Sequence, residues 1–295
     1  MKKWFCCFGF FIAHTVVIAQ QAEPILLQPG VVSNNAVFGY TLSPNAKQAL
    51  WVQSNNGRRD TLFIWEALVK KGKHRHKKPA SFSIEASQGK WKDIDPMFSP
   101  DGKTLYFQSN RPVPGMPHRK GFDIWAVTQL KNGKWSPAFH LGNAVNTDSS
   151  ESYSSVSNNG NMYFTVAHHG LTDIYMAPYE NGKYLTPIAL PDIINLPGER
   201  ESNPFIAADE SFLIYFSTGK DGLGEVDLYI SFRKNGAWQT PVNLGIPINS
   251  ALAEFCPFYH AGQRRLYFSR QQKQNGGMLE NVYWIPFNVE QYRQP

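Results

Sequence analysis

One phrase recurs along the chain and constrains its architecture. It is clearest from Phe98 to Phe107, where Ser-Pro-Asp-Gly predicts a type I turn that leads into an aromatic strand. Related copies end at Phe164, Phe216 and Phe268, and an eroded first copy ends at Val52, at spacings of 52 to 57 residues. Five copies at such a period indicate a protein built from internal repeats.

Each repeat carries further strand and turn signals after its opening phrase. A second strand signature follows, as in Phe122-Asp-Ile-Trp125. Asn-Gly pairs come next at 132–133, 181–182 and 235–236, and they predict hairpins because both turn positions favour positive φ. A fourth strand then follows in these three repeats. Four antiparallel strands per unit of about 50 residues are typical of a β-propeller blade.

The two ends of the chain complement each other. The last repeat has no fourth strand, and the segment 24–28 near the start resembles the missing piece. We therefore predict an all-β, five-bladed β-propeller in which this N-terminal strand closes the last blade and removes the open edge. A six-bladed ring is the alternative, if the first repeat hides extra strands. We expect one domain over 20–295, with repeats at 36–92, 93–147, 148–198, 199–252 and 253–287.

The order of the motifs resembles a known family of repeats. An acid three residues before Pro, then Ser-Pro-Asp-Gly, Leu-Tyr-Phe-x-Ser and Asp-Ile-Trp, is similar to the WD40-like (TolB-like, PD40) β-propeller repeat of exported bacterial proteins. The resemblance covers nearly all of the chain after its leader, although Val37 stands where the first repeat should have its acid. It implies a propeller fold and a role like that of the family's periplasmic binding modules.

The first residues are typical of an export signal. Lys2 and Lys3 precede an apolar run, and Val17-Ile-Ala19 offers small side chains for cleavage after Ala19. We predict a signal peptide over 1–19 and a periplasmic or secreted protein without a transmembrane segment after cleavage; an uncleaved anchor is the alternative. Cys256 would then be the one remaining cysteine, and we expect a buried, inert thiol.

The positive charge is concentrated in one place. The net charge is +6, but Lys2 and Lys3 belong to the leader, and the tract 70–78 holds six more basic residues. The other 21 basic residues face 23 acidic ones. We therefore expect no nucleic-acid partner, because such proteins spread basic residues over a face or groove. The tract, predicted as an enlarged hairpin tip, is a candidate for contact with an anionic surface through Lys70, Lys71, Lys73, Arg75, Lys77 and Lys78, or for metal capture by His74 and His76.

An acid opens the inner strand of four repeats. These acids are Asp93, Glu151, Glu201 and Glu254. Inner strands line the channel of a propeller, so the carboxylates are candidates for glycoside hydrolysis or for holding calcium. The alternative is that each acid fixes the loop before its own strand. From the sequence we assign no catalytic residue, metal site or cofactor.

The longer loops gather on one face, and binding residues tend to lie on such loops. The candidate ligand-binding residues there are His118, Phe122, Tyr153, His168 and His169. Together these features predict a non-catalytic binding module for an envelope protein or glycan. The alternative is a carbohydrate-active hydrolase or lyase that uses the four carboxylates.

Overall fold

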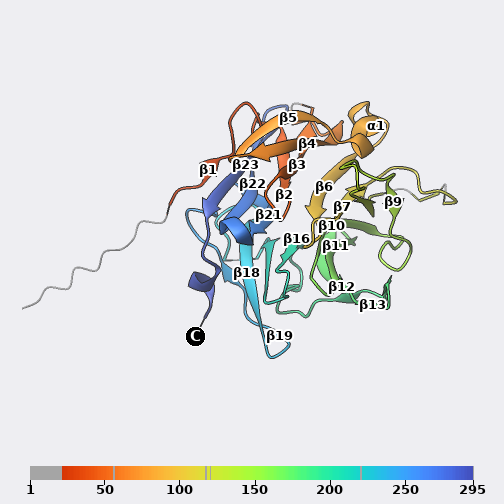
Figure 1. Cartoon of the computed structure of the whole chain (residues 1–295). Helices are drawn as coiled ribbons and strands as arrows, with labels where there is room; N and C mark the ends of the chain where they lie inside the picture. Colours follow the sequence, from red (N-terminus) through yellow and green to blue (C-terminus); the bar gives the residue numbers. More distant parts are fainter. Residues whose placement is uncertain (1–21, 56, 117, 120, 220, 295) are drawn as a thin grey trace, which may run out of the picture.

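The protein is a five-bladed β-propeller (Figure 1). The computed structural model describes residues 22–55, 57–116, 118–119, 121–219 and 221–294. The predicted signal peptide lies outside these residues. No helix in the described ranges has the length and apolar character needed to cross a bilayer.

Each blade is an antiparallel sheet whose first strand lies nearest the axis. The first blade consists of β2 (Val37–Leu42), β3 (Gln48–Ser54), β4 (Leu62–Lys70) and β5 (Lys73–Pro79). The second consists of β6 (Asp93–Phe98), β7 (Thr104–Ser109), β8 (Asp123–Thr128) and β9 (Phe139–His140). The third consists of β10 (Ser150–Val156), β11 (Met162–His168), β12 (Leu171–Ala177) and β15 (Ile188–Ala189).

The last two blades follow the same order. The fourth contains β16 (Glu201–Ile206), β17 (Phe212–Ser217), β18 (Asp227–Lys234) and β20 (Val242–Asn243), with β19 (Ala237–Trp238) as an extra strand on β18. The fifth contains β21 (Ala253–His260), β22 (Arg265–Gln274) and β23 (Gly277–Pro286). Short helical turns lie outside the sheets at η1 (Ser81–Ser83), α1 (Ile84–Ser87), η2 (Ala261–Gln263) and η3 (Val289–Tyr292).

The N-terminal strand completes the fifth blade, as predicted. β1 (Ile25–Leu26) pairs antiparallel with β23, with Ile25 opposite Trp284 and Leu26 opposite Tyr283. The inner strands β21 and β2 also pack together, so the first and last blades are neighbours. The ring is therefore closed with five blades, and over its described residues the first repeat adds only η1 and α1 to its four strands.

The core is divided among the gaps between blades. The described residues form five apolar clusters, one for each pair of neighbouring blades. In β17, Leu213 and Tyr215 pack toward the third blade, whereas Phe212 and Ile214 pack toward the fifth. Strands with apolar residues at consecutive positions fit this arrangement because both faces of each sheet are buried.

Two local features differ from a uniform repeat. The basic tract is not a hairpin tip as predicted: most of it forms β5, and the turn occupies only Lys71 and Gly72. In the third blade, the Asn181-Gly182 hairpin leaves its sheet and forms a separate pair, β13 (Tyr179–Glu180) with β14 (Lys183–Tyr184). This hairpin lies beside a groove described below.

Candidate functional site

The four acids that open the inner strands are fully buried. Asp93, Glu151, Glu201 and Glu254 each have 0% exposure. Both oxygens of Asp93 accept hydrogen bonds of 2.8 Å from Arg111. Glu254 accepts from Arg270 at 2.6 Å and from the backbone N–H of Ser250 at 3.0 Å. These carboxylates are thus engaged by loops of the protein itself.

The other two acids are held in the same way. The carboxylate of Glu201 accepts from the hydroxyl of Ser217 and from the backbone N–H of Leu196. The hydroxyl of Thr147 donates to Glu151. Burial raises the pKa of Glu201 to about 7, and it also raises the pKa of Glu151 and of Glu254. Their geometry fits loop anchoring, which was the alternative prediction from the sequence.

The predicted ligand-binding residues do not form one cluster. His118 and His169 are exposed, and Phe122 is half-buried. His168 is bound to Asp173 through an Nε2–Oδ2 contact of 2.7 Å, and its ring lies 6.3 Å from that of His169. Tyr153 differs from expectation, because its ring is buried at the axis rather than displayed on a loop. A ligand-binding role for these five residues remains a prediction.

The two histidines of the basic tract lie in different environments. His74 is buried and its Nε2 lies 3.0 Å from the hydroxyl of Tyr40, whereas His76 is exposed. Burial lowers the pKa of His74 to about 4. Within the described part of the chain, no group of three or more His, Cys, Asp or Glu side chains is placed to hold a metal ion. Metal capture and calcium binding remain predictions from the sequence.

Each inner strand contains one residue with a left-handed backbone conformation, and these five residues form a ring. Each inner strand has a register shift of the kind that marks a β-bulge, and each shift contains one residue with positive φ. The five residues are Gly39, Asp95, Tyr153, Asn203 and Cys256, each two positions after the acid or its Val37 equivalent. Repetition in every blade shows that the bulge belongs to the repeat.

Side chains of this ring fill the centre of the propeller. The Cys256 thiol lies 3.4 Å from Oδ1 of Asp95 and 3.5 Å from Oδ1 of Asn203. Gly39 is required here, because an added Cβ would lie 2.9 Å from Oδ1 of Asp95. Burial raises the pKa of Asp95 to about 6 and that of the Cys256 thiol well above its usual range. This thiol is buried, as predicted, and its raised pKa makes it a weak nucleophile.

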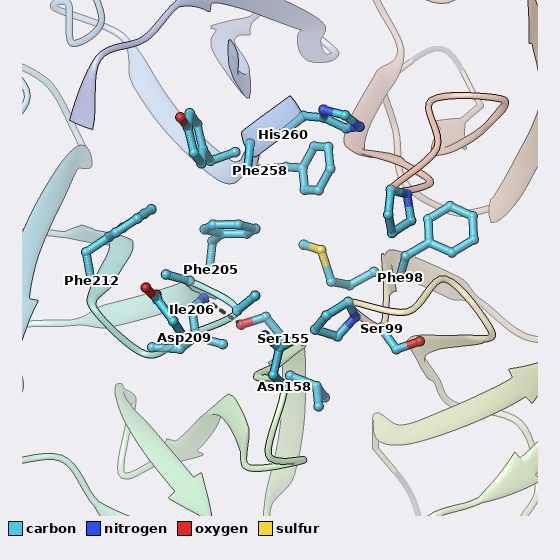
Figure 2. Close-up of a pocket in the computed structure, with 18 of the residues that line it drawn as sticks. Phe98, Ser99, Ser155, Asn158, Phe205, Ile206, Asp209, Phe212, Phe258 and His260 are labelled. Carbon is cyan, nitrogen blue, oxygen red and sulfur yellow. Dashed lines mark hydrogen bonds between the residues drawn. The ribbon is translucent and has the colours of Figure 1, made fainter. Parts of the chain in front are cut away.

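A pocket opens beside this ring, at the end of the axis where the inner strands run into the Ser-Pro-Asp-Gly turns. Its volume is about 470 Å³. Figure 2 shows Phe98, Phe205, Phe212 and Phe258 around the cavity, with His260 at its border. Leu42, Met97, Ile206 and Tyr259 complete the apolar lining. We call this cavity the axial pocket.

Position in the inner strand explains why these residues meet. Met97, Ser155, Phe205 and Phe258 are each the first paired residue after the bulge of their strand, so they occupy equivalent places around the axis. All four contribute to the pocket lining. Ser155 has no free hydroxyl to offer, because its Oγ donates to Pro204 and accepts from the backbone N–H of Ile206 (Figure 2). The floor of the pocket is therefore apolar in character.

Few polar side chains line the axial pocket, and two of them reach solvent. Asn158 and Asp209 are exposed there. His260 accepts a hydrogen bond at Nδ1 from the N–H of Gln263, so its Nε2 carries the proton directed at the carbonyl of Ser43. Burial lowers the pKa of His260, which favours this neutral form. The pocket thus combines apolar walls with a few orienting polar groups, as ligand sites commonly do.

A groove continues from the axial pocket between the second and third blades. The two cavities share Ser99, Pro100, Val156 and Asn158, and the groove has a volume of about 730 Å³. Its walls include Tyr106, Phe139, Tyr179 and Tyr184, the last two from the separate hairpin β13–β14. We call this cavity the aromatic groove. Pocket and groove together form a connected site that extends outward from the axis.

Sequence reasoning missed this site because it gave weight to long loops. The axial pocket instead lies on the face of the short turns. A signal was present in the sequence, since Phe205 and Phe258 each follow the Pro of their inner strand. Aromatic residues at that place, next to a turn, indicate a wide apolar end of the channel.

No family model matches the sequence. No curated protein matches it either. Among solved structures, a GH43_12 protein from the capybara gut metagenome shares 12% identity and has a TM-score of 0.56, with 91% of this chain and 54% of that chain covered. The α-L-arabinofuranosidase of Lactobacillus brevis shares 12% identity at a TM-score of 0.52, with 92% of each chain covered.

A third structure, the hydrazine synthase of Kuenenia stuttgartiensis, has 12% identity and a TM-score of 0.50, with 88% of this chain covered. The chain spans 35% to 38% of the length of this and two other proteins that it matches. At such low identity, these similarities establish the propeller fold alone.

Proposed function

We propose that the protein is an exported, non-catalytic binding module that receives an extended segment of a protein partner. One apolar side chain of the partner enters the axial pocket, and the adjoining residues lie along the aromatic groove. The observation that supports this most is the apolar lining of the axial pocket by Phe205, Phe212 and Phe258. Burial of an aromatic side chain against such walls supplies most of the free energy of binding at protein interfaces.

The composition of the site favours a peptide over a glycan. A sugar presents hydroxyl groups on all sides and requires many hydrogen-bond partners, whereas the lining of this pocket is mostly apolar. The aromatic groove adds Tyr side chains, which combine apolar area with a polar end and suit a peptide backbone. Export and the kinship with WD40-like (PD40) binding modules, both expected from the sequence, belong to the same proposal.

The alternative is a carbohydrate-active enzyme, because the arabinofuranosidase has a similar fold. It would require at least one of the four acids to face a ligand. All four have 0% exposure and are bonded to the protein's own side chains or loops. Their engagement supports binding over hydrolysis, and Glu201→Gln is expected to leave ligand binding unchanged.

A small probe tests the pocket directly. N-acetyl-L-phenylalaninamide supplies one aromatic side chain and two peptide groups, and a ligand of this size is expected to bind with roughly millimolar affinity. Ala208 lines the pocket and is exposed, so Ala208→Trp should fill the mouth without disturbing the core. We expect this variant to lose probe binding, measured by titration calorimetry.

The matched control is Ala251→Trp, which adds the same ring at an exposed position in the loop before β21. It should bind the probe as the wild type does. Equal affinity in the Ala208→Trp variant, equal loss in both variants, or displacement of the probe by neutral oligosaccharides would contradict the proposal.

A further inference from the structure

The outer strand of the first blade is unusual in length and charge. β5 has seven residues, whereas the outer strands β9, β15 and β20 have two each. It is the last strand of its sheet, so one of its edges has no paired neighbour. Lys70 and Lys71, which precede it, and Lys73, Arg75, Lys77 and Lys78 within it are exposed. The axial pocket does not include any of these residues.

Most of this charge has no internal partner. Lys78 pairs with Glu66 at 3.3 Å, and Nζ of Lys77 donates to the carbonyl of Val31. For Lys70, Lys71, Lys73 and Arg75, the described residues provide no ion pair.

The strand pairing adds to the unfavourable electrostatics. Lys70 lies directly opposite Lys73, and like charges in that relation destabilise a sheet. One or two lysines would suffice to keep an exposed edge from pairing with other chains. The number and pairing of these cations therefore point to an external anionic partner.

Apolar side chains accompany the cations. Leu68 is 58% exposed and lies directly opposite Arg75 on the same face of the sheet. Ile25 and Val31, from the closing segment of the fifth blade, are 48% and 39% exposed.

Besides the bond from Lys77 to Val31, two hydrogen bonds of Gln28 hold that closing segment against the β4–β5 hairpin. The side chain of Gln28 donates to the carbonyl of Gly72 and accepts from the N–H of His74. β1 and β5 accordingly occur on the same side of the propeller in Figure 1. Cations and exposed apolar residues thus share one edge, which we call the basic edge: Ile25, Val31, Leu68, Lys70, Lys71, Lys73, Arg75 and Lys77.

We infer that the basic edge docks on the surface of a membrane that contains anionic lipids. Cations near such a surface are attracted to the headgroups, and neighbouring apolar side chains insert at the boundary of the acyl chains. An acidic polysaccharide would match the cations but would leave Leu68, Ile25 and Val31 exposed. The remainder of the molecule is close to neutral, so the basic edge also sets the orientation of the propeller on the membrane.

Vesicle sedimentation tests this inference. The full-length protein is mixed with vesicles of phosphatidylcholine alone, or with 30% phosphatidylglycerol, and every variant keeps the same N-terminus so that residues 1–21 contribute equally. The wild type should partition to the anionic vesicles and be released at high salt, because surface charges are screened there. Lys73→Glu with Arg75→Glu should lower partitioning by at least about 25-fold, at about fivefold for each cation lost, because the two added carboxylates are also repelled.

The control changes the same charge elsewhere. Lys183→Glu with Lys234→Glu alters two exposed lysines in the third and fourth blades and should retain binding. Leu68→Ser should weaken binding at constant charge. Equal loss in both charge variants, equal binding to neutral vesicles, no binding by the wild type, or full competition by soluble alginate would overturn the inference.

Discussion

The hydroxyl of Tyr153 donates a hydrogen bond of 2.8 Å to the carbonyl oxygen of Pro257. Tyr153 belongs to the inner strand of the third blade and Pro257 to that of the fifth. The contact therefore crosses the axis and links two inner strands that are not neighbours in the ring, because the fourth blade lies between them in the blade order. It shows that a side chain crosses the axis between these two strands.

Removing this hydroxyl should weaken the fold. In Tyr153→Phe, the buried carbonyl of Pro257 loses its donor, which costs about 1–3 kcal/mol of unfolding free energy. Urea denaturation measures the change. Tyr179→Phe removes the same atom from an exposed ring and should stay within about 0.5 kcal/mol of the wild type. Equal stability of the two variants would show that the link across the axis contributes nothing.

Asp95 should make stability depend on pH in an unusual direction. Burial raises the pKa of its carboxyl from 3.8 to about 6, so between these values the folded protein keeps a proton that the unfolded chain releases. The stabilisation is complete below the unfolded value and is lost as the pH rises through about 6. Asp95→Asn removes this loss, since Asn cannot ionise and tolerates the left-handed backbone.

The comparison of Asp95→Asn with the wild type isolates this carboxyl from Glu201, whose pKa is also raised. The variant should resist urea better than the wild type at pH 8 and resemble it at pH 3.5. Urea midpoints across this range provide the test. A variant that is destabilised by the same amount at both pH values would refute the assignment.

The same pair of asparagine hydrogen bonds occurs in the loops that follow three of the blades, and it leads to a further prediction. Asn249 accepts from the N–H of Leu228 at 2.9 Å and donates to the carbonyl of the same residue at 2.9 Å. Asn146 and Asn195 form the same two bonds with Ile124 and Ile174. Asn249→Ala leaves the buried N–H of Leu228 without an acceptor, at a cost of about 1–3 kcal/mol.

Thermal unfolding would report this cost as a lower midpoint for Asn249→Ala. The exposed Asn275 is the matched control, and Asn275→Ala should unfold close to the wild type. If both variants unfold at the same temperature, the two hydrogen bonds between Asn249 and Leu228 do not contribute to stability.

The five-bladed propeller could be predicted from the sequence because each blade carries the same local turn and strand signals. Turn residues such as Pro100 and Gly102 have the same backbone role wherever they occur, and the N–H of Gly102 indeed bonds to the carbonyl of Ser99 at 2.8 Å. The missing strand of the last repeat predicted that the N-terminal strand closes the last blade, and β1 does pair with β23. Each of these inferences needed only a short stretch of chain.

The axial ring could not be predicted in this way. Its members are Gly, Asp, Tyr, Asn and Cys, and Tyr and Cys are not common choices for positive φ. Tyr153 and Cys256 adopt that conformation because contacts from other blades hold them, such as the bond to Pro257. The axial pocket depends on the same long-range placement, since its walls come from all five inner strands or the turns that follow them.

One measurement tests the central claim, that the axial pocket is the binding site, most directly. With the methionine methyl groups labelled by ¹³C, N-acetyl-L-phenylalaninamide is titrated and each methyl signal is followed by NMR. Met97 lines the axial pocket, whereas Met176 in β12 and Met278 in β23 line neither this pocket nor the aromatic groove. The Met97 signal should shift and saturate while those of Met176 and Met278 stay in place. An unchanged Met97 signal at saturating probe, or a shift confined to the other methionines, would contradict the account.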